Sequence, residues 1–132
     1  MILHLQSYLD IALLALRMII ATIFLVHGLP KWKMWKAKPS AQMSSAMLGI
    51  FRLLSLAEPL GALGLATGTL TQLASLGLAL VMLGAIYNKA FKWKRTFSGE
   101  GGWEFDLSIL GGLVVLIVIG AGTIAIDALM RW

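Results

Sequence analysis

Three charged side chains in this sequence could do chemistry because each lies inside or beside a long apolar stretch: Arg17, Glu58 and Glu104. A carboxylate held away from water can take up or release a proton, and a guanidinium can orient a carbonyl or anionic oxygen. An unpaired charge at the centre of a membrane helix costs about 2.5 to 3.5 kcal/mol. We therefore expect all three side chains to point into a shared polar interior.

The depths of Arg17 and Glu58 predict that these two side chains meet. Arg17 lies about 9 Å below the outer end of the first apolar stretch, and Glu58 lies near the middle of the second. The difference of about 7 Å is within reach of an arginine side chain. Such a pair either fixes the register of two helices or forms a site for substrate or protons, and both interpretations stay open.

Glu104 begins the last apolar stretch after a glycine-rich run at 98–102. An acid there is typical of a first helical turn, where the helix dipole favours negative charge. The functional alternative is a polar vestibule in which His27 and Asn88 lie at a similar depth, although a lone histidine can equally be an interfacial or packing residue. The candidate catalytic residues are Glu58 and Glu104, and the candidate substrate-binding residues are Arg17, His27 and Asn88.

Pro59 directly follows Glu58 and should kink its helix. Proline cannot donate a hydrogen bond to the carbonyl of Ser55, and its ring crowds that carbonyl. A freed carbonyl beside a carboxylate can help to build a binding site, although proline also kinks purely structural membrane helices.

Four apolar stretches position these residues, and each has about the length that an α-helix needs to cross a membrane. We predict an all-α fold: a four-helix transmembrane bundle with short loops and spans at about 11–29, 48–69, 70–89 and 104–126. The composition agrees, since 59% of residues are hydrophobic, 13% are charged and the mean hydropathy is +0.87. The whole chain, 1–132, is expected to be one integral membrane domain.

The net charge of +5 is concentrated in two of the connecting loops. By the positive-inside rule these loops face the cytoplasm, so both termini are extracytoplasmic in a multi-pass protein of the bacterial cytoplasmic (inner) membrane. Basic residues alternate with tryptophan there, which favours lipid headgroups over nucleic acid as the partner. The predicted lipid-interface residues are Lys31, Trp32, Lys33, Trp35, Lys92, Trp93 and Lys94.

The sequence lacks several motifs, and their absence limits the reactions that the chain could catalyse. The chain has no cysteine, which excludes disulfides and thiolate metal sites, and it has no nucleotide-binding or hydrolase signature. We predict no metal site and no self-contained redox cofactor. Glycines recur along helix faces, which predicts close helix packing; they are Gly61, Gly64, Gly68, Gly77, Gly84, Gly111 and Gly122.

The sequence from 16 to 127 resembles the DoxX family of small bacterial membrane proteins. The resemblance rests on Leu16-Arg17 and, in order, FLVHGLPK at 24–31, EPLGALGL at 58–65, GTLTQ at 68–72, GWE at 102–104 and GAGTIAID at 120–127. It implies a four-helix membrane bundle whose recurrent polar residues correspond to Arg17, Glu58 and Glu104.

The resemblance also implies a class of activity, because related members are similar to the membrane subunit of thiosulfate:quinone oxidoreductase. On that reading the chain is a subunit of a quinone-linked oxidoreductase: a cleft admits a quinone or small solute, Arg17 orients an oxygen, and Glu58 or Glu104 relays protons. Electrons would come from another membrane or membrane-associated subunit. Two alternatives stay open, namely a structural or assembly subunit and a small-solute carrier that requires a homo-oligomer.

Overall fold

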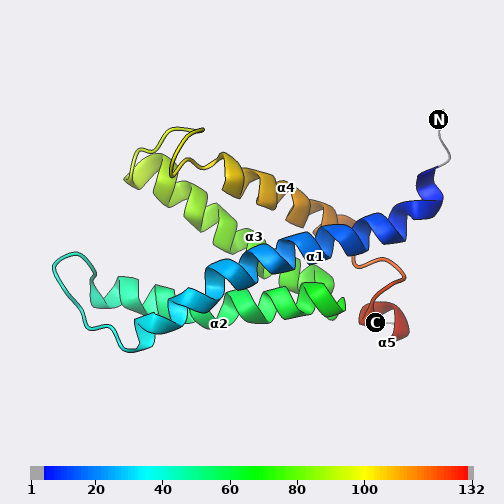
Figure 1. Ribbon diagram of the computed structural model, residues 1–132, viewed down its shortest axis with the longest axis horizontal. Helices are drawn as coiled ribbons and strands as arrows, with labels where there is room; N and C mark the ends of the chain where they lie inside the picture. Colours follow the sequence, from blue (N-terminus) through cyan, green and yellow to red (C-terminus); the bar gives the residue numbers. More distant parts are fainter. Residues whose placement is uncertain (1–4, 131–132) are drawn as a thin grey trace.

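The computed structural model describes residues 5–130, and this part of the chain is helical without any strand (Figure 1). The all-α prediction is therefore confirmed. The elements in chain order are η1 (Leu5–Tyr8), α1 (Leu9–Gly28), η2 (Leu29–Trp35), α2 (Ser45–Thr67), α3 (Thr71–Tyr87), η3 (Asn88–Lys92), α4 (Glu104–Ile119) and α5 (Ile126–Met130).

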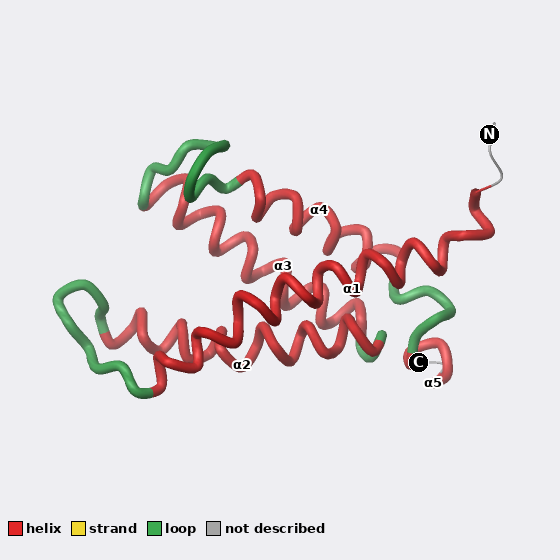
Figure 2. The backbone as a smooth tube through the Cα atoms, viewed as in Figure 1, coloured by secondary structure: helices red, strands yellow, loops and turns green. Residues whose placement is uncertain are grey.

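The four long helices form two antiparallel hairpins, α1 with α2 and α3 with α4 (Figure 2). The hairpins pack together where α2 turns into α3, and they diverge toward the two long loops at 36–44 and 93–103. We call these the closed end and the open end of the molecule. Both ends of the described chain lie at the closed end, where the segment after α4 returns to the start of α1.

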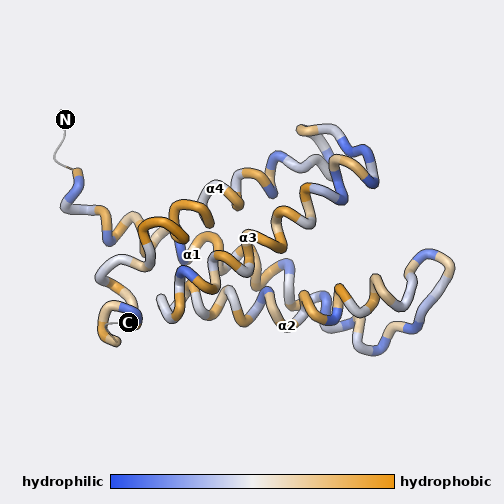
Figure 3. Tube along the Cα trace, turned by 180° about the vertical axis from the view of Figure 1, so that it is seen from behind, coloured by the Kyte–Doolittle hydropathy of each residue, from blue (hydrophilic) through white to orange (hydrophobic). Residues whose placement is uncertain are grey.

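Three helical segments are long and apolar enough to cross a membrane: Leu5–Trp35, Ser45–Thr67 and Thr71–Lys92. Many large apolar side chains point outward from these helices, such as Leu53, which is 66% exposed. Figure 3 shows the apolar helix bodies between more polar loops. Outward apolar side chains suit contact with lipid chains, because lipid is itself an apolar solvent.

α4 is shorter than the predicted span 104–126, since it ends at Ile119. Gly120 follows with φ 87° and ψ −159°, a backbone conformation essentially restricted to glycine, and Gly122 also has a positive φ of 79°. These two residues break the helix and lead the chain into a segment at 120–125, which we call the strap. The prediction was wrong here because an apolar segment with two glycines has the hydropathy of a helix without its geometry.

The small residues of α2 bring it close to α3. A Cβ added to Gly61 would lie 2.8 Å from the Leu78 side chain, and one added to Gly64 would lie 3.2 Å from the Ala74 Cβ. The predicted close packing is confirmed for these two glycines. Gly77, Gly84 and Gly111 do not bring helices of this chain together, because Cβ atoms added there would meet nothing within 4 Å among residues 5–130.

Gly68 ends α2 in a Schellman motif. Its φ is +70°, its N–H donates to the carbonyl of Leu65, and the N–H of Thr69 donates to the carbonyl of Gly64. A side chain at this position would also collide with the Arg17 guanidinium and with Ala125 of the strap. Glycine is therefore required both by the backbone and by the space.

We predict that Gly68→Ala lowers the free energy of unfolding in detergent micelles by about 1 to 2 kcal/mol or more, because a left-handed conformation disfavours a Cβ. The matched control is Gly77→Ala, which fills open space within a helix and should be neutral or stabilising. Thermal unfolding followed by circular dichroism measures both. Equal destabilisation by the two variants would contradict this account of Gly68.

Candidate functional site

Glu58 is buried in α2, with 2% of its surface exposed, and it pairs with a lysine from the segment after α1. Lys31 Nζ lies 2.6 Å from Glu58 Oε1 and 2.7 Å from Oε2. Two short charge-assisted contacts compensate the cost of burying the carboxylate. Glu58 is therefore held as part of an ion pair within the first hairpin.

The carbonyl freed by Pro59 is used in building this site. Trp32 Nε1 donates a 2.7 Å hydrogen bond to the Ser55 carbonyl, and Trp35 Nε1 donates a 2.9 Å bond to Ser55 Oγ. η2 is thereby fixed along the part of α2 that precedes Pro59, and Lys31, in the same short helix, reaches Glu58. The carbonyl of Ser55, which Pro59 leaves without its helical donor, thus supplies an acceptor for the element that carries the lysine.

Gly28, the last residue of α1, lets the two elements come this close. A Cβ added there would lie 3.0 Å from both Glu58 Cβ and Pro59 Cδ. Beyond Glu58, the Arg52 guanidinium donates to the carbonyls of Met34 and Ala37 at 3.0 Å each. Glu58 and Arg52 of α2 therefore bind the segment that follows α1 at several points between Lys31 and Ala37.

The second hairpin has an ion pair of its own. Lys89 Nζ lies 2.7 Å from Asp106 Oδ2, and Asp106 is 6% exposed. Asn88 and Lys89 belong to η3, a π-helical turn that extends α3 toward the loop. Such turns shift side chains relative to a regular helix and often occur at functional sites.

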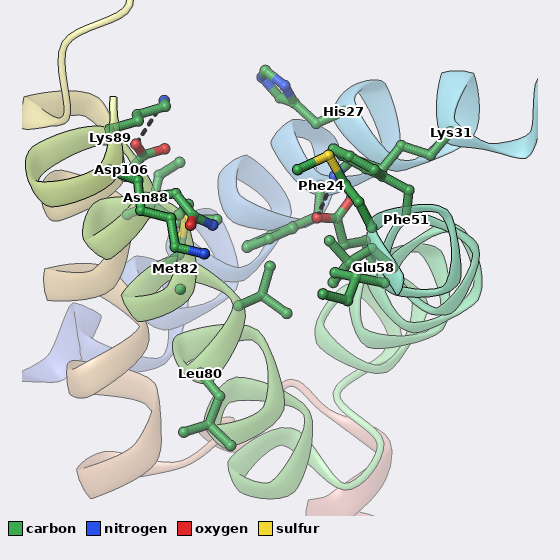
Figure 4. Close-up of a pocket in the computed structure, with 18 of the residues that line it drawn as sticks. Phe24, His27, Lys31, Phe51, Glu58, Leu80, Met82, Asn88, Lys89 and Asp106 are labelled. Carbon is green, nitrogen blue, oxygen red and sulfur yellow. Dashed lines mark hydrogen bonds and ion pairs between the residues drawn. The ribbon is translucent and has the colours of Figure 1, made fainter. Parts of the chain in front are cut away.

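A groove of about 690 Å³ lies between the two hairpins and extends toward the open end (Figure 4). Both ion pairs line it, one on each side, together with His27 and Asn88. Its size is in the usual range for small-molecule sites. The apolar lining includes Ile23, Phe24, Ile50, Phe51, Leu54, Leu80, Val81, Met82, Phe105 and Ile109.

Three of the five candidate site residues line this groove: Glu58, His27 and Asn88. Glu104 does not, because it is exposed on the first turn of α4. Asp106, two residues later, takes the inward position that we expected for Glu104. The sequence carried a signal for this, since Asp106 shares a spacing of three and four residues with the buried Ile109 and Leu113.

Arg17 lies away from the groove, and its predicted pairing with Glu58 is wrong. Its guanidinium is fully buried and donates to the carbonyl of Leu65, at 3.1 Å, and to the carbonyl of Ile124 in the strap. The carbonyl of Leu65 accepts this bond in addition to the one from Gly68 N–H, because a carbonyl oxygen has two lone pairs. Arg17 therefore joins three segments at the closed end, and the three predicted charges do not share one interior.

Two acids complete the closed end. The Asp127 carboxylate accepts hydrogen bonds from the N–H groups of Leu70 and Thr71, at 2.7 and 2.8 Å, and so caps the N-terminus of α3. The Asp10 carboxylate accepts from the N–H and the hydroxyl of Thr123, at 2.8 and 2.6 Å. The strap is thus bound to the first hairpin by side chains distant in sequence.

Three of the predicted lipid-interface residues also have structural contacts that the sequence did not reveal: Lys31, Trp32 and Trp35. Lys31 pairs with Glu58, and the indole N–H groups of both tryptophans bind α2. Trp32 and Trp35 remain 55% and 52% exposed, so their contact with lipid stays a prediction. Lys31, Lys92 and Trp93 line the groove, whereas Trp32, Lys33, Trp35 and Lys94 do not. No group of three or more residues that could hold a metal ion occurs between residues 5 and 130.

The groove can bind a ligand that is mainly apolar and carries oxygen acceptors. In its interior the polar side chains are chiefly hydrogen-bond donors, namely the ammonium groups of Lys31 and Lys89 and the amide of Asn88. Both acids that line it already contact a lysine. Acceptor oxygens on a ligand would therefore meet complementary groups.

Comparison with known proteins gives one match: residues 12–93 fit the family model described as DoxX. The matched region contains both halves of the Lys31–Glu58 pair as well as Arg17 and Lys89. No curated protein and no solved structure matches the chain.

We predict that Trp32→Phe destabilises the protein by about 1 to 3 kcal/mol, because it leaves the Ser55 carbonyl without its donor. The matched control is Trp93→Phe. Both rings are 55% exposed, but the Trp93 indole N–H has no hydrogen-bond partner among the described residues. Denaturant or thermal unfolding in micelles measures the difference, and two indistinguishable variants would show that the bond to Ser55 contributes nothing.

Proposed function

This chain belongs to the DoxX family of membrane proteins, and we propose that it is an integral membrane subunit of a quinone-linked oxidoreductase. The quinone would bind in the groove between the hairpins. The observation that carries the proposal is the groove itself: an apolar cavity of about 690 Å³ with an ion pair on each side.

The proposal includes a topology. The open end holds nine of the ten basic residues in the described part of the chain, so it would face the cytoplasm by the positive-inside rule. The closed end, with both chain ends, would face the opposite side of a bacterial cytoplasmic membrane. α4 would provide a fourth crossing, with residues beside its 16-residue helix completing the distance.

The groove suits a quinone because that ligand combines an apolar ring and tail with two carbonyl oxygens. The walls offer Phe24, Phe51 and Phe105 to the ring. Hydrogen-bond donors are available at Lys31 and Asn88. The widening between the hairpins gives a lateral route of entry from lipid.

Reduction of a quinone to a quinol takes up two electrons and two protons. Glu58 and Lys31 are placed to supply and recover protons, because the buried carboxylate touches the lysine and the lysine side chain is 22% exposed. The electrons would come from a companion subunit that carries a flavin, haem or iron–sulfur centre. Glu104 has no part in this proposal, because it lies outside the groove.

A second candidate function, that of an assembly subunit, is favoured by a separate observation. The exposed glycines Gly77 and Gly111 leave open space on the outer surfaces of α3 and α4. Small residues of this kind allow another transmembrane helix to approach closely. A companion subunit or a second copy could pack there.

Quinone binding is tested with purified protein in nanodiscs of zwitterionic lipid, titrated with a short-chain quinone. We expect the double variant His27→Ala with Asn88→Ala to weaken binding about tenfold, since each hydrogen bond contributes about 0.5 to 1.5 kcal/mol. The control is Ser108→Ala, which removes a hydroxyl bonded to its own helix outside the groove. Equal affinities of the double variant and the control would exclude the groove as the quinone site.

Proton transfer is tested in the complex purified from native membranes. Glu58→Gln should lower quinone reduction at least tenfold, while quinone affinity changes little. Removing one partner of a buried pair can itself unfold a protein, so the double variant Glu58→Met with Lys31→Met is made as well. We expect it to fold, because both charges are gone, and to remain inactive. Full turnover in either variant, or a chain that purifies without any cofactor-bearing companion, would contradict the oxidoreductase role.

A further inference from the structure

One cation of the groove lacks an acidic partner. Lys31 and Lys89 lie 2.6 and 2.7 Å from Glu58 and Asp106 respectively, whereas Lys92 has no acid within ion-pair distance among residues 5–130. Lys92 is exposed, while the two acids are buried. The groove therefore has a neutralised interior and a positive mouth.

The surroundings of the mouth increase this positive charge. The open end carries nine basic residues against four acids, and two of those acids already belong to the ion pairs of the groove. The basic residues are Lys31, Lys33, Lys36, Lys38, Arg52, Lys89, Lys92, Lys94 and Arg95. A concentrated positive potential attracts anions to the mouth.

An apolar surface continues from the mouth into the groove. In addition to Lys92, the lining of the groove includes Trp93, which is 55% exposed, and the polar Ser44, which is the N-cap residue of α2. Further apolar side chains follow along α2 and α3, among them Met47, Ile50, Leu54 and Leu80. A free phosphate would leave this surface uncovered, whereas a lipid would cover it with an acyl chain while its phosphate meets the lysine.

We propose that the mouth of the groove binds one anionic phospholipid, with its phosphate at Lys92 beside Trp93 and an acyl chain along the apolar wall of α2. The negative headgroup balances the unpaired ammonium, and the aromatic ring lies at the headgroup level that tryptophan prefers. This site goes beyond the quinone site, which would lie deeper, at Glu58 and Asn88, and does not depend on any redox role.

The test is native mass spectrometry of the purified protein with an equimolar mixture of phosphatidylglycerol and phosphatidylcholine. We expect preferential retention of one phosphatidylglycerol. Lys92→Gln should reduce that retention about fivefold, the effect of one lysine near a charged membrane surface. The matched control is Lys94→Gln, which removes the same charge from the same loop but does not line the groove, and should leave retention unchanged.

Three outcomes would overturn the proposal: equal retention of the two lipids, equal losses in the two variants, or displacement of the lipid by millimolar glycerol phosphate. Equal losses would indicate diffuse attraction of surrounding lipid, and displacement would indicate a site for a free phosphate ester. Lys92→Gln should leave quinone affinity in zwitterionic nanodiscs unchanged. The experiments can therefore refute the lipid site without refuting the quinone site, and the reverse.

Discussion

The structure depends on one constraint: inside a membrane, backbone groups that helices leave unpaired must find partners within the protein. Several irregularities of this chain are met by specific side chains. Trp32 binds the carbonyl freed by Pro59, and Arg17 binds carbonyls at the end of α2 and in the strap. Asp127 caps the exposed amides at the start of α3. The breaks in the helices are thus the places where distant segments join.

This constraint explains why Arg17 and Glu58 do not pair. Arg17 has five N–H donors and no acceptor, so the carbonyls of Leu65 and Ile124 can take its hydrogen bonds, and the carboxylate that acts on its charge is that of Asp127 at the same end. Glu58, an acceptor, is met by Lys31 because η2 continues past α1 and is fixed against α2 by the bond from Trp32 to the Ser55 carbonyl. Each hairpin thereby neutralises its own buried acid, and the groove lies between two closed units.

Helices α1 to α3 and the burial of Arg17 and Glu58 were predictable from the sequence because hydropathy and the cost of burying charge act locally. The freed carbonyl of Ser55 was predictable for the same reason, since Pro59 removes a donor at a known position. The partner of the freed carbonyl was not predictable, because Trp32 reaches it through a short helix whose direction depends on Gly28 packing against Glu58. The predicted depths of Arg17 and Glu58 assumed straight helices that end at the membrane surface. The helical path instead continues from α1 into η2, which carries Lys31 to Glu58.

The choice between Glu104 and Asp106 shows a different limit. Residues two apart on a helix point in nearly opposite directions, so only one of these acids can face the interior. Glu104 aligns with Ser108 and Gly111, and Asp106 aligns with Ile109 and Leu113. We favoured the small-residue face as the packing face, but Gly111 faces open space and the face with large apolar residues is buried. Here the second hairpin is organised by apolar burial: Gly111 lies on its outer surface, whereas the neighbouring Gly112 packs against Ile20 of α1.

The two ends of the molecule differ in how the hairpins are joined, and this difference bears on function. At the closed end, hydrogen bonds of Arg17, Asp10 and Asp127 link segments from both hairpins. At the open end, no hydrogen bond or ion pair within residues 5–130 crosses between them, and the rings of His27 and Phe105 lie 6.1 Å apart. Because each ion pair stays within one hairpin, the hairpins can move apart there without separating charges. A groove that widens at so little electrostatic cost suits a ligand that enters sideways from the lipid.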